Sequence, residues 1–594
     1  MTPPPLQPFA PQCVKPLPSP YWQRWELNRK YLLSLTAQNL LNPHYLEAGL
    51  WAPNEQPKDI HWGWESPTCQ LRGEFVGHWL WGAAHIVATT GDPELRGRID
   101  YIVGEIARCQ QENGGEWAGS IPEKYLHWAA RGKYVWAPHY VVHKQLIGLL
   151  AAHTLLGNAQ ALDICTRWAA WFHRWTGGFS REQMDNLLDV ETGGMLEAWA
   201  DLYGVTGDAQ HRELVQRYYR GRLFDRLLAG EDPLTNMHAN TQIPEIAGAA
   251  RAFEVTGEQR YRDIVEAYWR SAVTERGTYC TGGQTCGEVW TPAGQQAARL
   301  GDKNQEHCTV FNMMRLAAYL YRWTGDPVYA DYWERNLLNG VMAQQNPQTG
   351  MITYFLPLRA GSTKKWGSAT NDYWCCHGTL VQAHTFYNQM TFHADAAGLT
   401  IGQYIPGELT WTRDGQTLKV TLTHDYQKQY ASRPHSVAFD VTITTPEPVA
   451  FTLSVRMPEW LAGQPTVTIN GQPHAGGAKP RSFLRVQRTW ATGDRLHVEL
   501  PTKLWTCPLP DEPDTVAFMD GPVVLAALAD TTRPLYGDPR DPTTLLTPDN
   551  EREWGLWRIG YRTRDDGPGL RFVPFHEIVD ERYTVYFPVR PARR

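Results

Sequence analysis

The pattern of hydrophobic residues changes once along this 594-residue chain, near residue 394. Before that point, apolar residues recur at intervals of three and four positions, as expected of helices with one buried face. The clearest segments are 79–88, 145–155, 195–203, 246–253 and 314–321. This spacing predicts a helical domain over residues 22–394.

Each of these segments is followed by a short sequence typical of a helix end. A glycine comes next, at Gly91, Gly157, Gly207, Gly257 and Gly325, and then Asp, Asn or Glu. Glycine commonly ends a helix, and a short polar residue commonly begins the next one. Helical hairpins repeated every 50 to 68 residues, each unable to bury its apolar face alone, favour an α/α toroid, a barrel of six hairpins. An irregular helical bundle is the alternative.

Beyond residue 394 the pattern alternates with a period of two. Segments rich in Val and Thr lie at 418–424, 437–445, 449–457, 465–471 and 495–500, and turn sequences such as RDGQ and INGQ separate them. This pattern predicts an antiparallel β-sandwich over residues 395–530. We expect residues 531–594, strand-like at 582–589, to pack on the other domains, and the proline-rich residues 1–21 to form an N-terminal extension.

Charge and composition exclude several classes of partner. The chain carries 56 Lys and Arg against 62 Asp and Glu, a net charge of −6, which argues against nucleic-acid binding. No apolar run is long enough to span a membrane, and no secretory signal is visible, so we expect a cytoplasmic protein without membrane contact. The 26 Trp, 27 Tyr and 17 Phe offer rings on which sugars stack, although large cores also use them.

Four residues suggest a metal site. Ten cysteines are too few for a disulfide scaffold, so reduced thiols are expected. Glu306 and Cys308, together with the adjacent Cys375 and Cys376, offer one carboxylate and three sulfurs, a donor set that suits tetrahedral Zn²⁺. The spacing matches no zinc finger. Cysteines buried merely as small residues, or a strained vicinal disulfide, are the alternatives.

Several motifs resemble those of one enzyme family. They are WESPTCQLRGEFVGHWL (64–80), YVWAPHYVVHK (134–144), ETGGMLEAWADLYGVTGD (191–208), HANTQIPE (238–245), TGGQTCGE (281–288), NQEHCTVFN (304–312), YWERNLLNG (332–340), TYFLPL (353–358), NDYWCCHGT (371–379) and FVPFHEIVDERYTVYFPV (572–589). They resemble the β-L-arabinofuranosidases of glycoside hydrolase family 127 and its relative, family 146, over most of the chain. The resemblance implies a retaining exo-glycosidase that releases a terminal furanose, expected to be β-L-arabinofuranose, from plant-derived oligosaccharides.

The resemblance also implies roles for individual residues. Cys375 is expected to be the nucleophile and Glu288 the acid/base. Zinc is expected to bind Glu306, Cys308, Cys375 and Cys376, and the sugar to contact Glu334, Tyr354, His143 and Gln242. The chemistry is consistent, because a thiolate is the reactive form of cysteine and a metal ion deprotonates the thiols that bind it. Activation of water at an open metal position is the competing mechanism.

The chain departs from the family pattern at four positions. Relatives commonly continue the two cysteines as CCxGTGxE, whereas this chain has CCHGTLVQ, with Leu380 and Gln382. His307 stands between Glu306 and Cys308 where a small hydroxyl residue is expected, and Glu74 stands where many relatives have His. The metal ligands are unchanged, so these departures are expected to alter the sugar pocket and not the type of reaction.

Other functions remain open at this point. One is hydrolysis of a different pectin-type, furanose-like sugar. A metal-free sugar epimerase or isomerase on the same fold is another, and a non-catalytic carbohydrate-binding protein with a structural zinc is a third. The β-sandwich could also support a homodimer, although no motif specifies one.

Overall fold

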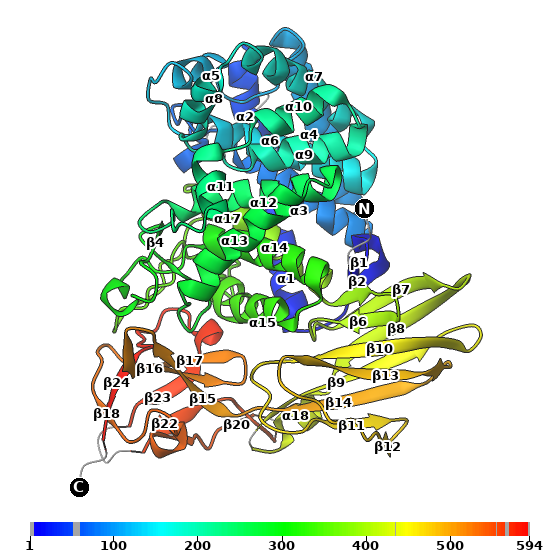
Figure 1. Cartoon of the computed structure of the whole chain (residues 1–594), viewed down its shortest axis with the longest axis vertical. Coiled ribbons are helices and arrows are strands. Elements are labelled where there is room, and N and C mark those ends of the chain that lie inside the picture. The colour runs from blue at the N-terminus through cyan, green and yellow to red at the C-terminus, as the bar shows by residue number, and fades with distance from the viewer. Residues whose placement is uncertain (1–4, 52–59, 434, 554, 565–568, 592–594) are drawn as a thin grey trace.

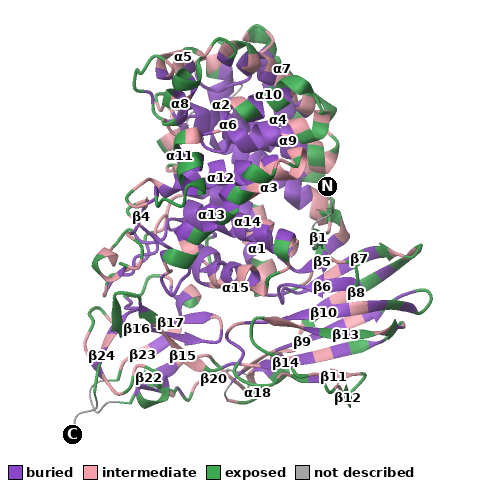
Figure 2. Ribbon diagram, in the orientation of Figure 1, coloured by how far each residue is buried: buried purple, intermediate pink, exposed green. Residues whose placement is uncertain are grey.

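The computed structural model describes residues 5–51, 60–433, 435–553, 555–564 and 569–591. A helical part lies at one end of the molecule, and the three largest of the five sheets in the described residues lie at the other (Figure 1). The change of pattern near residue 394 is confirmed, because the last helix before it, α17 (Cys375–Ala383), is followed by strand β5 (Phe392–Ala394). Buried residues lie along the central helices of the helical part and along the strands of the sheets (Figure 2).

The helices of the N-terminal part confirm the predicted helical domain. They are α1 (Pro20–Ser34), α2 (Ala37–Glu47), α3 (Phe75–Thr90), α4 (Pro93–Glu112), α5 (Lys124–Ala129), α6 (Pro138–Leu156), α7 (Ala159–Thr176), α8 (Arg181–Leu188), α9 (Met195–Thr206), α10 (Ala209–Arg217), α11 (Gly221–Leu228), α12 (Ala239–Thr256), α13 (Gln259–Trp269), α14 (His307–Thr324), α15 (Pro327–Asn336), α16 (Met342–Gln344) and α17. The five apolar segments identified above lie in α3, α6, α9, α12 and α14. Of the described helices, none is long and apolar enough to cross a membrane.

The glycines of the repeated pattern end these five helices as predicted. Gly91, Gly157, Gly207, Gly257 and Gly325 adopt left-handed φ angles between 67° and 73°, which cost glycine nothing. Side chains of Asp92, Asn158, Asp208 and Asp326 then cap the next helix. The helix pairs α3/α4, α6/α7, α9/α10, α12/α13 and α14/α15 are therefore hairpins.

The first member of each hairpin forms an inner layer. Contacts run from α3 to α6, α9, α12, α14 and α17 in turn, and α17 contacts α3 again. Helix α6 is buried along most of its length, as expected of a helix that is apolar on all sides. The loops at the ends of these inner helices therefore meet around a common centre.

Two sheets pack face to face beyond the helices. One has the strand order β1-β5-β6-β10-β13 and the other β12-β11-β14-β9-β8-β7-β2. Their strands are β1 (Gln7–Pro8), β2 (Val14–Pro16), β5, β6 (Gly398–Ile401), β7 (Gly407–Arg413), β8 (Gln416–His424), β9 (Ser436–Thr444), β10 (Val449–Met457), β11 (Thr466–Ile469), β12 (Gln472–Pro473), β13 (Ser482–Trp490) and β14 (Arg495–Pro501). Both sheets contribute side chains to one apolar core, including Leu453, Phe439 and Trp490.

The sandwich differs from the prediction in two ways. Its strands pair antiparallel with the exception of β6 and β10, which are parallel. Strands β1 and β2, from the expected N-terminal extension, pair with β5 and β7 at the edges of the two sheets. Pairing at a sheet edge satisfies backbone groups that would otherwise be exposed, so this segment ties the start of the chain to the sandwich.

A third sheet forms the C-terminal part. Its order is β18-β24-β16-β17-β23-β22-β19, with β15 paired to β16. The strands are β15 (Leu504–Leu509), β16 (Glu512–Asp520), β17 (Val523–Ala527), β18 (Leu535–Tyr536), β19 (Leu546–Pro548), β22 (Tyr561–Thr563), β23 (Arg571–Pro574) and β24 (Phe587–Arg590). Residues 504–527, which we assigned to the sandwich, therefore belong to this sheet, because β16 and β17 pair with β24 and β23. Of the strand predicted at 582–589, the part from Phe587 onward is regular.

Candidate active site

The four predicted metal ligands lie together at the N-termini of two helices. Glu306 is the residue before α14, and Cys308 lies in its first turn. Cys375 and Cys376 are the first two residues of α17. One ligand atom from each of the four residues lies within 4.8 Å of the others, and all four are buried. Both helices thus direct their positive ends at groups that are anionic when ionised.

The distances fit a tetrahedral zinc ion. Sγ of Cys376 lies 3.3 Å from Sγ of Cys308 and 3.9 Å from Sγ of Cys375. Oε1 of Glu306 lies 3.7 and 3.8 Å from the sulfurs of Cys375 and Cys376. Zn–S bonds of about 2.3 Å in a tetrahedron separate two sulfurs by about 3.8 Å. Oε2 of Glu306 is buried without a partner among the described residues. All ten cysteines are free, so the vicinal disulfide is wrong.

Burial makes this group costly to ionise on its own. It raises the pKa of Cys375, Cys376 and Glu306 well above their usual values, and neighbouring ionisable groups add to the effect. Burial also opposes ionisation of Cys308, but hydrogen bonds from the thiols of Cys375 and Cys376 outweigh it, and the pKa of Cys308 is lowered. A bound cation would favour the ionised form of every member.

A short hairpin presents Glu288 to this group. Strand β3 (Thr285–Cys286) pairs with β4 (Val289–Trp290), and the turn residues Gly287 and Glu288 have φ angles of 62° and 68°. Two left-handed residues are what a tight hairpin turn requires. Glu288 is one-third exposed, with 34% of its side chain accessible, so its carboxylate can be reached from solvent.

Tyr354 connects the carboxylate to the sulfur. Its hydroxyl donates to Oε1 of Glu288 at 2.5 Å and lies 3.4 Å from Sγ of Cys375. Oε1 of Glu288 and Sγ of Cys375 are therefore separated by no more than about 5.9 Å. Burial, together with the nearby thiol of Cys375, raises the pKa of Tyr354, so its hydroxyl stays protonated. The predicted pair of functional groups thus faces one space.

The backbone around the site is held in uncommon conformations. Positive φ angles occur at Gln305 (44°), immediately before Glu306, and at Tyr373 (48°), two residues before Cys375. Glu288 itself is a third case. Such conformations cost free energy for residues with a side chain and cluster where side chains must be aimed. We therefore attribute them to the positioning of the four ligands and the carboxylate.

Gln242 and His143, two of the predicted sugar contacts, are buried side chains near the site. Oε1 of Gln242 accepts a hydrogen bond from Nε1 of Trp290 at 3.1 Å, so this side chain braces the strand after Glu288. His143 packs against Gly194, where an added Cβ would lie 2.5 Å from its Nε2. Burial lowers the pKa of His143 far below its usual value, and its ring is therefore neutral.

Glu334 is not brought to the site. Its carboxylate accepts hydrogen bonds from Nη2 of Arg456 and Nε1 of Trp460, both at 2.8 Å. Both partners belong to the β-sandwich region, so Glu334 connects the helical part to the sheets. The expected contact of Glu334 with the sugar is thus not found; its oxygens are occupied by these two donors.

Sequence reasoning missed two residues beside Glu288. Nε2 of His238, one residue before α12, lies 3.8 Å from Oε2 of Glu288. Glu191 is half-buried, and desolvation, with the nearby Glu288, raises its pKa. Both lie in motifs that carried the family resemblance, HANTQIPE and ETGGMLEAWADLYGVTGD. Only the β3–β4 hairpin shows that the first of these motifs adjoins Glu288, through the bridge between His238 and Val289.

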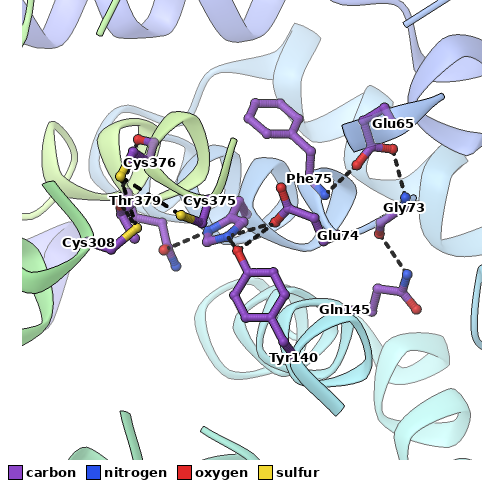
Figure 3. A network of polar contacts seen from close by, with 12 residues as sticks. Glu65, Gly73, Glu74, Phe75, Tyr140, Gln145, Cys308, Cys375, Cys376 and Thr379 are labelled. Carbon is purple, nitrogen blue, oxygen red and sulfur yellow. Dashed lines mark hydrogen bonds and ion pairs between the residues drawn. The ribbon is translucent and has the colours of Figure 1, made fainter. Parts of the chain in front are cut away.

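Two of the departures from the family pattern meet in one buried network. Nδ1 of His78 lies 2.8 Å from Oε1 of Gln382, and its Nε2 lies 3.1 Å from Oε2 of Glu74. The hydroxyl of Tyr140 donates to the same oxygen of Glu74 at 3.1 Å. Figure 3 shows Tyr140 and Glu74 with the cysteines. Because Gln382 lies on α17, this network anchors the helix that carries Cys375.

A third departure, His307, is also buried and paired. Its Nδ1 lies 3.0 Å from Oγ1 of Thr379, and the same hydroxyl lies 3.3 Å from Sγ of Cys308. Burial lowers the pKa of His307 to about 3. The ring is therefore neutral, and it contacts Cys308 indirectly through the hydroxyl of Thr379.

Comparisons with known proteins cover both the helical part and the sandwich. The family model "Beta-L-arabinofuranosidase, GH127 catalytic domain" matches residues 13–389, and "Beta-L-arabinofuranosidase, GH127 middle domain" matches residues 398–502. Neither description names family 146. No curated protein matches the chain.

Solved structures show the same fold over nearly the whole chain. A GH127 β-arabinofuranosidase superimposes with a TM-score of 0.75 at 18% identity, covering 99% of this chain and 98% of that one. A protein described as a glycoside hydrolase gives 0.73 at 18% identity, with the same coverage. The GH127 β-L-arabinofuranosidase of Geobacillus stearothermophilus T6 gives 0.71 at 17% identity, covering 97% of this chain and all of that one. Taken with the match of the catalytic-domain model, these findings show that the chain belongs to the β-L-arabinofuranosidase family GH127 and is a glycosidase.

Proposed function

We propose that the protein is a zinc-dependent, retaining exo-glycosidase that releases a terminal β-L-arabinofuranose from oligosaccharides. The observation that carries this proposal is the spacing of Glu288 and Cys375, at most about 5.9 Å. Retaining glycosidases separate their two catalytic groups by about 5–5.5 Å, and inverting enzymes by about 6.5–9.5 Å. The sugar is proposed from the family and from the descriptions of the similar structures.

Glu306, Cys308, Cys375 and Cys376 would hold the zinc ion. When bound, zinc keeps the thiols ionised and fixes their direction. The donor set supports this assignment, as do the separations of 3.3 to 3.9 Å and the buried, unpartnered oxygen of Glu306.

The protein side chains then divide the reaction into two displacements. In the first, Sγ of Cys375 forms a bond to the anomeric carbon while Glu288 gives its proton to the departing glycosidic oxygen. In the second, Glu288 takes a proton from water, the water oxygen bonds to the anomeric carbon, and the thiolate of Cys375 leaves. The hydroxyl of Tyr354 lies between the two groups in both steps.

The arrangement of the helices favours the six-hairpin toroid. The inner helices α3, α6, α9, α12, α14 and α17 contact one another in a closed series, and the first five each begin a hairpin. The site lies at the N-termini of α14 and α17. A homodimer and a cytoplasmic location stay predictions.

Hydrolysis of an aryl β-L-arabinofuranoside tests the proposed function. The wild-type protein should release the phenol, and Cys375→Ala should reduce kcat/KM by about 10³-fold or more. Cys286→Ala is the matched control, because Cys286 lies in the same hairpin as Glu288 but outside the ligand group, and it should stay active. If a wild-type preparation holding zinc hydrolyses neither this substrate nor other aryl furanosides, the non-catalytic binding protein is favoured.

A mechanism-based inhibitor separates sulfur attack from attack by metal-activated water. An epoxide analogue of the furanose should leave a sugar adduct on Cys375, seen by peptide mass spectrometry. An inhibited enzyme whose cysteines are all unmodified would contradict the assignment of Cys375. Metal-free protein that interconverts free sugars would support the epimerase instead.

A further inference from the structure

A cavity of about 400 Å³ adjoins the catalytic pair, with Tyr354 and Trp374 in its wall. Its size is typical of a site for a small ligand. Phe355 and Trp374 offer rings, and the remaining wall is mainly polar and charged. Tyr354 connects it directly to Glu288 and Cys375.

The wall of this cavity is strongly basic. Lys303, Arg359, Lys365 and Arg582 line it, and Asp302 is the one acidic residue in the wall. Asp302 forms an ion pair with Arg359 at 2.6 Å. Lys303, Lys365 and Arg582 are exposed, and no carboxylate of the described residues forms an ion pair with any of the three. Three positive charges therefore remain unbalanced around one cavity.

This charge is not a property of the whole surface. The protein has a net charge of −6, so three unpaired cations around one cavity oppose the overall balance. A cleft lined by one sign of charge concentrates ligands of the opposite sign. The cavity also assembles these cations from distant parts of the chain, since Arg582 comes from the C-terminal sheet region and Lys303 from the loop before Glu306.

One of the cations, Lys303, lies beside the hairpin that carries Glu288. The carbonyl of Lys303 accepts a hydrogen bond from the backbone N–H of Gly287, at the tip of the hairpin that presents Glu288. An acid that protonates the departing oxygen must face the leaving group, and the nucleophile attacks from the opposite side of the sugar. The position of Lys303 beside this hairpin therefore favours the leaving-group side of the bond for the basic cavity.

We propose that the cavity binds an anionic glycan, with the carboxylates of uronic acid residues on the leaving-group side of the scissile bond. This proposal rests on the proposed function for its orientation, but the recognition of charge does not. Lys303, Lys365 and Arg582 contact the carboxylates, and Trp374 supplies a ring face to a sugar. The substrate class is then a terminal furanose carried by an acidic oligosaccharide.

Binding measured without turnover tests the proposal. Wild-type protein is titrated by calorimetry at low ionic strength with a short oligogalacturonate, which has no furanose to release. The same oligosaccharide with its carboxyls methyl-esterified is the neutral probe, and a sulfated disaccharide is the alternative anion. We expect the acid form to bind at least tenfold more tightly than the ester, and to weaken as salt is added.

Variants locate the site. Lys303→Gln, Lys365→Gln and Arg582→Gln should each weaken binding of the oligogalacturonate about three- to tenfold, whereas Lys479→Gln, an exposed lysine of the sandwich, should not change it. Equal affinity for acid and ester, or equal affinity of all four variants, overturns the proposal. Tighter binding of the sulfated probe overturns the assignment to uronic acids.

The outcomes separate this proposal from the proposed function. Release of phenol from a neutral aryl arabinofuranoside by the wild-type enzyme tests the function alone. Binding of oligogalacturonate without that hydrolysis would leave the basic cavity as an acidic-glycan site and remove the proposed reaction. Hydrolysis without charge-dependent binding would support the proposed reaction and exclude the acidic-glycan site.

Discussion

The hydroxyl of Tyr354 lies 2.5 Å from Oε1 of Glu288 and also 3.4 Å from Sγ of Cys375. Because this one hydrogen bond orients the acid towards the sulfur, Tyr354→Phe should lower kcat on an aryl arabinofuranoside about 10²-fold. Zinc content should change little. Tyr329→Phe, on the outer helix α15, is the control. Full kcat in Tyr354→Phe would show that the contact has no part in catalysis.

Removal of Glu288, the proposed acid/base, should allow chemical rescue. Glu288→Ala should lose about 10²- to 10⁴-fold in kcat on a substrate with a poor leaving group, and much less on one with an activated phenol. Azide needs no proton removed, so it should restore turnover of the activated substrate and give a glycosyl azide. Its anomeric configuration, read by NMR, should match that of the substrate. An inverted azide would contradict the two-displacement mechanism.

Metal content should depend on the four ligands together. The isolated enzyme should hold about one zinc ion per chain. Cys376→Ser should lose it, and with it activity and thermal stability, since a metal that binds the folded state stabilises that state. Cys280→Ser, a buried cysteine outside the ligand group, should keep its zinc. Elemental analysis and calorimetry measure both effects, and full zinc content in Cys376→Ser would exclude this ligand set.

The buried network of Glu74, His78 and Gln382 should make the stability of the protein depend on pH. Burial raises the pKa of Glu74 to about 8, against the opposing effects of Lys144 and Tyr140, from an ordinary value of 4.5. Between these values the folded state holds a proton that the unfolded state has lost, so stability falls as pH rises, by at most about 1.4 kcal/mol per pH unit. Glu74→Gln should flatten the decline in Tm between pH 5 and 8. An unchanged slope, equal to that of the exposed-site control Glu94→Gln, would show that Glu74 is ionised in the folded protein.

Much of the fold and site could be predicted because the signals are local. A glycine after an apolar helical segment commonly ends the helix, and the five glycines from Gly91 to Gly325 do so with left-handed φ angles. The group of Glu306, Cys308, Cys375 and Cys376 could be predicted because vicinal cysteines and a Glu-x-Cys pair are rare combinations of side chains. The family resemblance then supplied Glu288 and Tyr354, which the structure brings to the same space.

The features that could not be predicted depend on contacts between segments far apart in the sequence. Strands β15 to β17 are indistinguishable in sequence from sandwich strands, and only pairing with β23 and β24 assigns them to the third sheet. His238 meets Glu288 because α12 begins beside the β3–β4 hairpin. The cations of the basic cavity come from three separate stretches of chain, so no local pattern could reveal them.

Glu334 matches the family motif, but its carboxylate pairs with residues of the β-sandwich region. Its carboxylate is paired with Arg456, which is completely buried and also pairs with Asp331. Glu334→Gln removes one charge from this group and leaves a buried guanidinium incompletely paired, which should cost about 1–3 kcal/mol of stability. A sugar contact would instead raise KM without lowering Tm. We expect the opposite result: calorimetry should give a lower Tm, and KM should be unchanged. A raised KM at constant Tm would instead show that Glu334 contacts the substrate.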